Sequence, residues 1–87
     1  MASWLDISRH AEPNTKAVLV HDLPACGAQP LIPAGTRVAV VENSLNEMQP
    51  AIVLQAEGDD GEIWVPGPDH GDVDHWDQEA PIVLLRP

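Results

Sequence analysis

Residues 50–65 read PAIVLQAEGDDGEIWV and contain two short runs rich in β-branched residues. The first run covers residues 50–57 and the second covers residues 62–65, with a link of glycine and acidic residues between them. Val and Ile favour strands, and the Asp60-Gly61 pair favours the positive φ angles of a tight turn. The stretch therefore predicts an antiparallel β-hairpin at the centre of the fold.

Three further runs have the same character: KAVLVHD at residues 16–22, GTRVAVVE at residues 35–42 and PIVLL at residues 81–85. Nine prolines divide the chain, and an interior proline costs a helix about 3 kcal/mol. Strands therefore fit between the prolines better than long helices do. The chain of 87 residues has room for one domain, so we expect an all-β fold of five short antiparallel strands.

The predicted core comes from the inward side of each strand: Val18 or Leu19, Val38, Val40, Ile52, Leu54, Ile63, Val65, Ile82 and Leu84. Several runs are apolar at successive positions, so the outer face of the sheet also needs cover. Alternation places Trp64 on that outer face, opposite Ile63 and Val65. Either the N-terminal segment or a second copy of the chain would cover it, and we expect at least a dimer.

Residues 1–15 are predicted to be a short N-terminal segment packed on a single domain of residues 16–87. Within this segment, the Ser3-x-x-Asp6 spacing would cap one helical turn. The alternation of Leu5 and Ile7 would equally suit an edge strand. Both structures remain open at this point.

The order of the runs resembles that of a Src-homology-3-like (SH3-like) small barrel over residues 16–87. AVLVHD at residues 17–22 leads through a long proline-bearing loop to LIPAG at residues 31–35, as the first strand of that family leads to its second. The resemblance implies a five-stranded antiparallel barrel. The peptide groove of the family depends on tyrosines and on a tryptophan that opens the third strand. This chain has no Tyr and has Gln49-Pro50 at that place, so the resemblance extends to the fold and not to proline-rich ligands.

The charge of the chain narrows the choice of partners. Fourteen Asp and Glu against four Lys and Arg give a formal net charge of −10, which repels nucleic acid and anionic membranes. No apolar run approaches the ~18 residues that cross a bilayer, and the N-terminus lacks the pattern of a secretory signal. The single Cys26 cannot form an internal disulfide. We therefore expect a cytoplasmic protein that binds neither nucleic acid nor membrane directly.

Nine carboxylates lie between residues 57 and 79, where the chain has no Lys or Arg. Such a run is typical either of a solvated face or of a surface that recognises a basic macromolecule. For the second function, the predicted binding residues are Asp59, Asp60, Glu62, Trp64, Asp69, Asp72, Asp74, Trp76 and Asp77.

The sequence HGDVDH at residues 70–75 offers a weaker candidate for a metal site. His70, Asp72, Asp74 and His75 carry ligand atoms that Zn²⁺, Ni²⁺ or Mn²⁺ accept, although their spacing matches no established ligand motif. Neither a nucleophile activated by a base nor a phosphate-binding glycine loop is evident. We therefore predict no catalytic residue and no cofactor.

These features favour a non-enzymatic acidic binding protein, homo-oligomeric, whose acidic hairpin and loop recognise a basic protein surface. Phage- or plasmid-borne inhibitors and accessory proteins have this profile. Two alternatives remain: a small oligomeric enzyme or ligand or metal binder with a pocket between subunits, and a structural subunit of a larger assembly. A defined pocket or a bound ion would favour the first alternative, and strand pairing between chains would favour the second.

Overall fold

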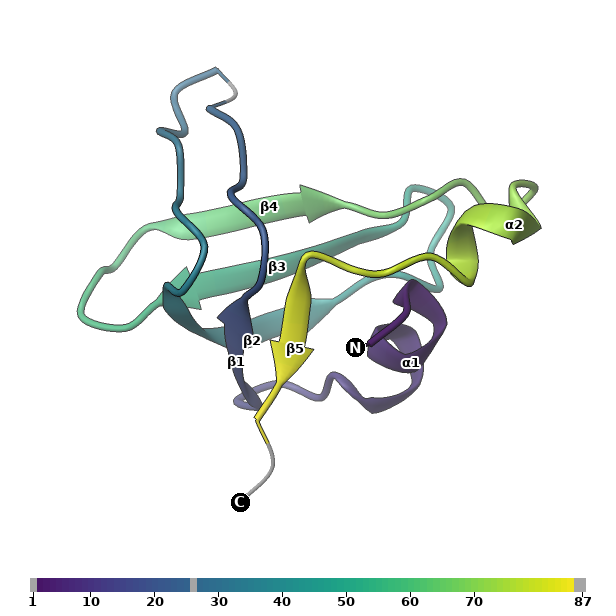
Figure 1. Ribbon diagram of the computed structural model, residues 1–87, viewed down its shortest axis with the longest axis horizontal. Helices are drawn as coiled ribbons and strands as arrows, with labels where there is room; N and C mark the ends of the chain where they lie inside the picture. Colours follow the sequence, from purple (N-terminus) through teal and green to yellow (C-terminus); the bar gives the residue numbers. More distant parts are fainter. Residues whose placement is uncertain (1, 26, 86–87) are drawn as a thin grey trace.

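The computed structural model describes residues 2–25 and 27–85 (Figure 1). Most of the regular structure is β-strand, as predicted, and the helices are short. In chain order the elements are α1 (Trp4–His10), β1 (Lys16–Leu19), β2 (Arg37–Asn43), β3 (Ala51–Ala56), β4 (Glu62–Pro66), α2 (Val73–Trp76) and β5 (Ile82–Leu84).

The five strands form one antiparallel sheet in the order β4-β3-β2-β1-β5. Strands β1 to β4 follow one another as neighbours, and β5 returns to the free side of β1. Among the described residues no ladder joins the two edge strands, β4 and β5. The all-β antiparallel sheet is therefore confirmed, whereas its closure into a barrel is not.

The turn between β3 and β4 lies earlier than predicted. Asp59 N donates to Ala56 O at 3.1 Å, and Gly58 between them has φ of 80°. Gly61 lies outside the left-handed region, and its N–H donates to Asp59 Oδ1 at 3.0 Å. The prediction of the turn at Asp60-Gly61 was therefore wrong, because Gly58 supplies the positive φ directly after β3.

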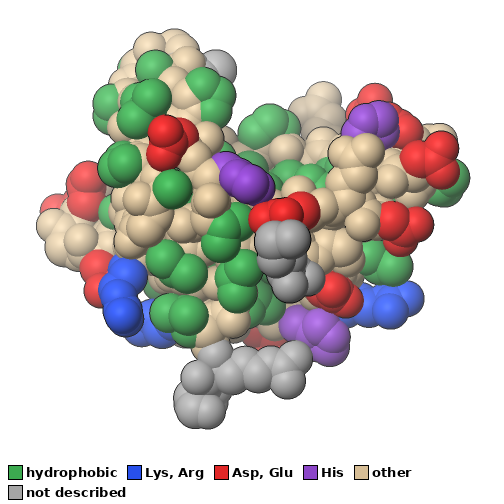
Figure 2. Space-filling view, viewed as in Figure 1, with side chains coloured by type: hydrophobic (Ala, Val, Ile, Leu, Met, Phe, Trp, Pro, Cys, Tyr) green, Lys and Arg blue, Asp and Glu red, His purple; other side chains and the backbone are tan. Residues whose placement is uncertain are grey.

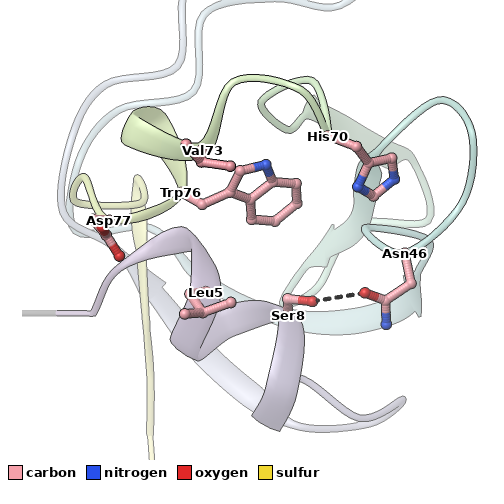
Figure 3. A pocket seen from close by; sticks show the side chains of 7 residues that line it. All are labelled: Leu5, Ser8, Asn46, His70, Val73, Trp76 and Asp77. Carbon is pink, nitrogen blue, oxygen red and sulfur yellow. Dashed lines mark hydrogen bonds between the residues drawn. The ribbon is translucent and has the colours of Figure 1, made fainter.

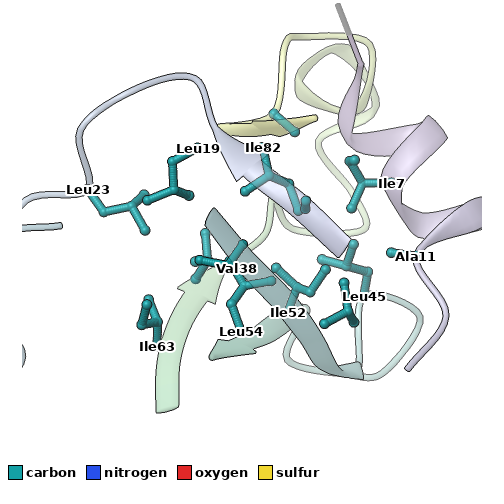
Figure 4. Packing of buried hydrophobic residues seen from close by; sticks show 14 residues of the cluster. Ile7, Ala11, Leu19, Leu23, Val38, Leu45, Ile52, Leu54, Ile63 and Ile82 are labelled. Atoms are coloured by element: carbon teal, nitrogen blue, oxygen red, sulfur yellow. The ribbon is translucent and has the colours of Figure 1, made fainter. Parts of the chain in front are cut away.

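The core lies on the inner side of the sheet (Figure 4). Every predicted core position is buried except Leu84, which is partly buried, and of the first pair it is Leu19 that is buried. The cluster has further members outside the predicted core: Ile7, Ala11, Ala17, Leu23, Leu45 and Ala80.

The N-terminal segment forms a helix rather than an edge strand. Ser3 Oγ accepts from Asp6 N at 3.2 Å, and Asp6 Oδ2 accepts from Ser3 N at 3.4 Å, which completes a capping box. Ile7 is fully buried in the core cluster, so α1 packs on the inner side of the sheet. The capping signal of the sequence was therefore the better guide.

A β-bulge in β2 fixes the position of α1. The register against β3 shifts between Val40 and Glu42, which turns the side chain of Asn43 toward the helix. Asn43 Nδ2 lies 3.4 Å from Ile7 O, 3.2 Å from Ser8 O and 3.1 Å from Ala11 O. Ile7 O already accepts from Ala11 N at 2.9 Å, so the side-chain amide mainly serves Ser8 O and Ala11 O at the end of α1.

The outer face of the sheet remains partly apolar. Ile63 and Val65 point inward, so Trp64 projects outward as predicted and is 57% exposed. It lies across from Val53, which is only 1% exposed. Trp4 packs against the core cluster instead, so α1 leaves Trp64 in contact with solvent.

Two parts of the sequence lie outside the described residues. They are the single Cys26 and the last two residues of the predicted domain.

No helix in the described part of the chain is long and apolar enough to cross a membrane.

Candidate functional site

The predicted acidic surface is divided between the two ends of β4 (Figures 1 and 2). At one end is the turn group, which consists of Glu57, Asp59, Asp60 and Glu62. At the other end is the α2 group, which consists of Asp69, Asp72, Asp74 and Asp77. All eight residues are exposed. Because β4 spans about 16 Å at its five residues, one small partner surface would not contact both groups.

One cation partly neutralises the turn group. Lys16 Nζ lies 3.9 Å from Glu57 Oε1. Lys16 also lines a shallow hollow beside this turn, together with Asp59 and Asp60. The α2 group has no Lys or Arg among its ion pairs in the described residues, so the negative potential is expected to be stronger at that end.

The segment that carries the α2 group is tied to the N-terminus. Trp4 N donates to Gln78 O at 3.1 Å, and Ala80 N donates to Ala2 O at 2.9 Å. On its other side, Glu79 contacts the loop after β1, with 3.1 Å between His21 Nε2 and Glu79 Oε1. The two backbone hydrogen bonds hold α2 beside α1 although their sequences lie far apart.

Trp76 organises the loop before α2. Its indole ring stacks on the imidazole of His70, with 5.7 Å between the ring centroids and 10° between the planes. The indole N–H donates to Asp69 O at 2.9 Å, and His70 Nε2 contacts the backbone carbonyl of Glu47. The loop is thereby anchored both to α2 and to the β2–β3 connection.

The structure brings two of the predicted metal ligands together and gives a third a different environment. His75 Nδ1 pairs with Asp72, whereas His70 faces Trp76 and Glu47. The hydrogen bond to Asp72 raises the pKa of His75, the charge of Asp72 adds to this effect, and burial opposes it only weakly. In the described part of the chain, no three His, Cys, Asp or Glu side chains are arranged to hold a metal ion.

A pocket of about 380 Å³ lies between α1 and α2 (Figure 3). Its apolar walls come from Leu5 on α1 and from Val73 and Trp76 on α2. At its polar side, Ser8 Oγ donates to Asn46 Oδ1 at 3.2 Å. The remaining lining residues are His70 and Asp77. This volume falls within the range of small-ligand clefts. A single chain forms the pocket, whereas the ligand-binding alternative places its pocket between subunits.

Two exposed apolar side chains belong to the segments that line the pocket. Val73 on α2 lines the pocket and is 69% exposed, and Met48 is 96% exposed in the loop that supplies Asn46. Flexible Met side chains adapt readily to the shape of a partner.

The structure gathers only part of the predicted site. Trp76 and Asp77 line the pocket, whereas Trp64 lies on the outer face of the sheet, where its backbone N–H donates to Gln29 Oε1 at 3.2 Å.

Four residues of the site were not predicted from the sequence: Leu5, Ser8, Asn46 and Val73. The three-residue spacing of Leu5 and Ser8 places them on one face of a helix, but the sequence of this segment suits an edge strand equally well. Comparison with protein-family models, with curated proteins and with solved structures finds no match for this chain.

Proposed function

We propose that this protein is a non-enzymatic binding protein that recognises a basic surface of a partner protein. The contact surface consists of the α1–α2 pocket, the exposed side chains of Val73 and Met48, and the α2 group. One observation carries the proposal: an apolar pocket and four exposed carboxylates lie at the same end of the molecule.

The two components of this surface have different roles. The carboxylates attract a cationic partner over a distance, which raises the association rate and, through that rate, the affinity. The apolar walls at Leu5, Val73 and Trp76 exclude water from the contact and slow dissociation. A nucleic acid would be repelled by the same carboxylates.

Two variants with equal charge test the location of the site. The first replaces the α2 group by Asp69→Asn, Asp72→Asn, Asp74→Asn and Asp77→Asn. The second replaces the turn group by Glu57→Gln, Asp59→Asn, Asp60→Asn and Glu62→Gln. Each removes four carboxylates and changes the formal net charge from −10 to −6. A difference in affinity between the two variants therefore reports the position of the carboxylates rather than the total charge of the protein.

Ligands for this test come from peptides selected on the unmodified protein from a random displayed library, and binding is then measured by calorimetry. We expect basic peptides whose affinity falls steeply between roughly 50 and 500 mM salt, as the Debye length shrinks from about 14 to about 4 Å. The α2-group variant should lose at least about tenfold in affinity and the turn-group variant less than about threefold. Selection of non-basic peptides, or equal losses in both variants, would refute the proposal.

The proposal also includes the barrel-like fold, the oligomeric state and the cellular location of the protein. The strand order is consistent with an open form of an SH3-like barrel. The exposed Trp64 on the outer face supports self-association into a homo-oligomer, which sedimentation at micromolar concentration would test. The single Cys26 suits a reducing cytoplasm, where an inhibitor or accessory protein of a phage or plasmid would act.

A further inference from the structure

We infer that the partner presents a basic amphipathic α-helix, which lies in the pocket between α1 and α2. This inference rests on the proposed function and specifies the form of its partner. Protein segments dock mainly as an added strand, as a helix in a groove or as a polyproline helix on aromatic side chains. The described strands and pocket favour the second of these.

An added strand would find few donors along β4. Trp64 N–H points away from β3 and is already bonded to Gln29 Oε1 at 3.2 Å. Alternate residues of a strand direct their backbone groups to the same side, so Glu62 and Pro66 share this free edge. Pro66 has no N–H, and Glu62 adds a charge, which are two common protections of an edge strand.

The opposite edge of the sheet is also a poor template. Strand β5 has only three residues, and Ile82 is fully buried, backbone included. Val83 lies opposite Val18 of β1. On either side of this pair, Val20 N donates to Pro81 O at 2.8 Å and Leu85 N donates to Lys16 O at 2.8 Å. The backbone groups of Val83 therefore face β1, and those of its two neighbours face outward. Leu84 is therefore the one residue of β5 whose edge is both outward and accessible.

The geometry of the α1–α2 pocket suits a helix. Leu5 and Ser8 occupy one wall, and Val73 and Trp76 occupy the facing wall (Figure 3). Each pair is spaced by three residues on its own helix, so its two side chains lie on one face of that helix. The α1 helix is about 10 Å long at its seven residues. Two turns of a partner helix, with apolar residues at i and i+3 or i+4, would match this length.

The charges around the pocket also predict which side of the bound helix faces α2 and which side faces α1. Asp74 and Asp77 flank the α2 wall. On the α1 side, Arg9 follows Leu5 by four residues and so lies on the same helical face. Lys and Arg of the partner helix should therefore face α2, and the side that faces α1 should be neutral or acidic near Arg9.

Two peptides of identical composition distinguish a bound helix from general attraction to cations. Both consist of Leu, Ala, Lys and Arg. The first has leucines at helical spacing and the second at alternate positions, so both have the same charge. Each is titrated into the full chain, labelled with ¹⁵N, at low salt. The indole N–H signal of Trp76 reports the pocket, and that of Trp64 serves as an internal reference on another face.

We expect the helix-patterned peptide to bind at least about tenfold more tightly than the alternating peptide. Its binding should shift the Trp76 indole signal and the backbone signals of α1 and α2, leave Trp64 unchanged, and increase the helical circular dichroism of the peptide. Val73→Ser should weaken it by roughly three- to tenfold through lost apolar contact. The matched control is Val41→Ser on β2, at an exposed Val outside the pocket, and it should have no effect.

The remaining outcomes separate this inference from the proposed function. Equal, salt-dependent binding of both peptides at Trp76 overturns the helix inference and leaves recognition of a basic partner intact. Tighter binding of the alternating peptide, with shifts along β4 or β5, overturns the inference in favour of an added strand. If neither peptide shifts the signals of α1 and α2, both the inference and the proposed location of the site are wrong.

Discussion

The side chain of Asn43 connects β2 to the end of α1, and its removal should destabilise the whole molecule. In the Asn43→Ala variant, the backbone oxygens of Ile7, Ser8 and Ala11 lose their contact with Nδ2. Leu45 N loses its acceptor, Asn43 Oδ1, at 3.1 Å. The amide has two hydrogens, so the three carbonyls share about two full hydrogen bonds, and Leu45 N accounts for a third.

The expected loss follows from these contacts. Each net hydrogen bond contributes about 1 kcal/mol, and the site is partly buried, so Asn43→Ala should lower the free energy of unfolding by about 2–3 kcal/mol. For a domain of this size, that corresponds to a decrease in Tm of about 10–20 °C. Domains are typically stable by only about 5–15 kcal/mol, so the effect is a large share of the total.

A second substitution separates hydrogen bonding from packing. Asn43→Asp keeps the shape of the side chain and the acceptor for Leu45 N, but it places an anion at the negative end of α1. At pH 7 it should be at least as destabilising as Asn43→Ala. Below about pH 4 the carboxyl group takes up a proton, so the difference between the two variants should shrink or reverse.

Urea denaturation, followed by circular dichroism, measures both effects. Asn46→Ala is the matched control, because Asn46 is exposed and its side chain has one hydrogen bond within the described part of the chain, from Ser8 at 3.2 Å. We expect a change within about 0.5 kcal/mol. The reasoning fails if Asn43→Ala stays within that same margin. It also fails if Asn43→Asp is the more stable of the two variants at pH 7.

Three further predictions concern the helix cap, a close contact and a titration. Ser3→Ala removes half of the capping box and should cost about 1 kcal/mol in urea denaturation. Gly67→Ala should cost about 1–3 kcal/mol, because the new Cβ would lie 2.6 Å from Cδ2 of the buried Leu45. NMR titration should give His75 a pKa above 6.5 that decreases in Asp72→Asn. The pair with Asp72 therefore stabilises the fold fully below about pH 6.5 and loses this effect as the pH rises through the folded-state pKa.

The strands were predictable because each is a β-branched run bounded by Gly, Pro, Asn or Asp. The turn after β3 was not, because Glu57-Gly58 and Asp60-Gly61 both suit a turn and only the backbone geometry selects Gly58. Leu45 was missed for another reason. It is a single apolar residue in a polar loop, where no periodicity signals that it is fully buried.

The candidate site was predictable only in part, because it is assembled from three distant segments. Trp76 and Asp77 stood out by residue type within the acidic run. Leu5 and Asn46 come from α1 and from the β2–β3 connection, and local sequence carries no information on their proximity to α2. The division of the carboxylates between two ends follows from the extended strand β4 that lies between them, which the spacing of the charges alone does not indicate.

The bulge in β2 joins the stability of the fold to the shape of the candidate site. With a regular ladder, alternation from Val38 and Val40 would point Glu42 inward. Its carboxylate would then face the end of α1, where the carbonyl oxygens already concentrate negative charge. The extra residue leaves Glu42 exposed and presents the amide of Asn43 instead. Because α1 supplies the wall of the pocket that contains Leu5 and Ser8, a backbone irregularity in the sheet sets the position of that wall.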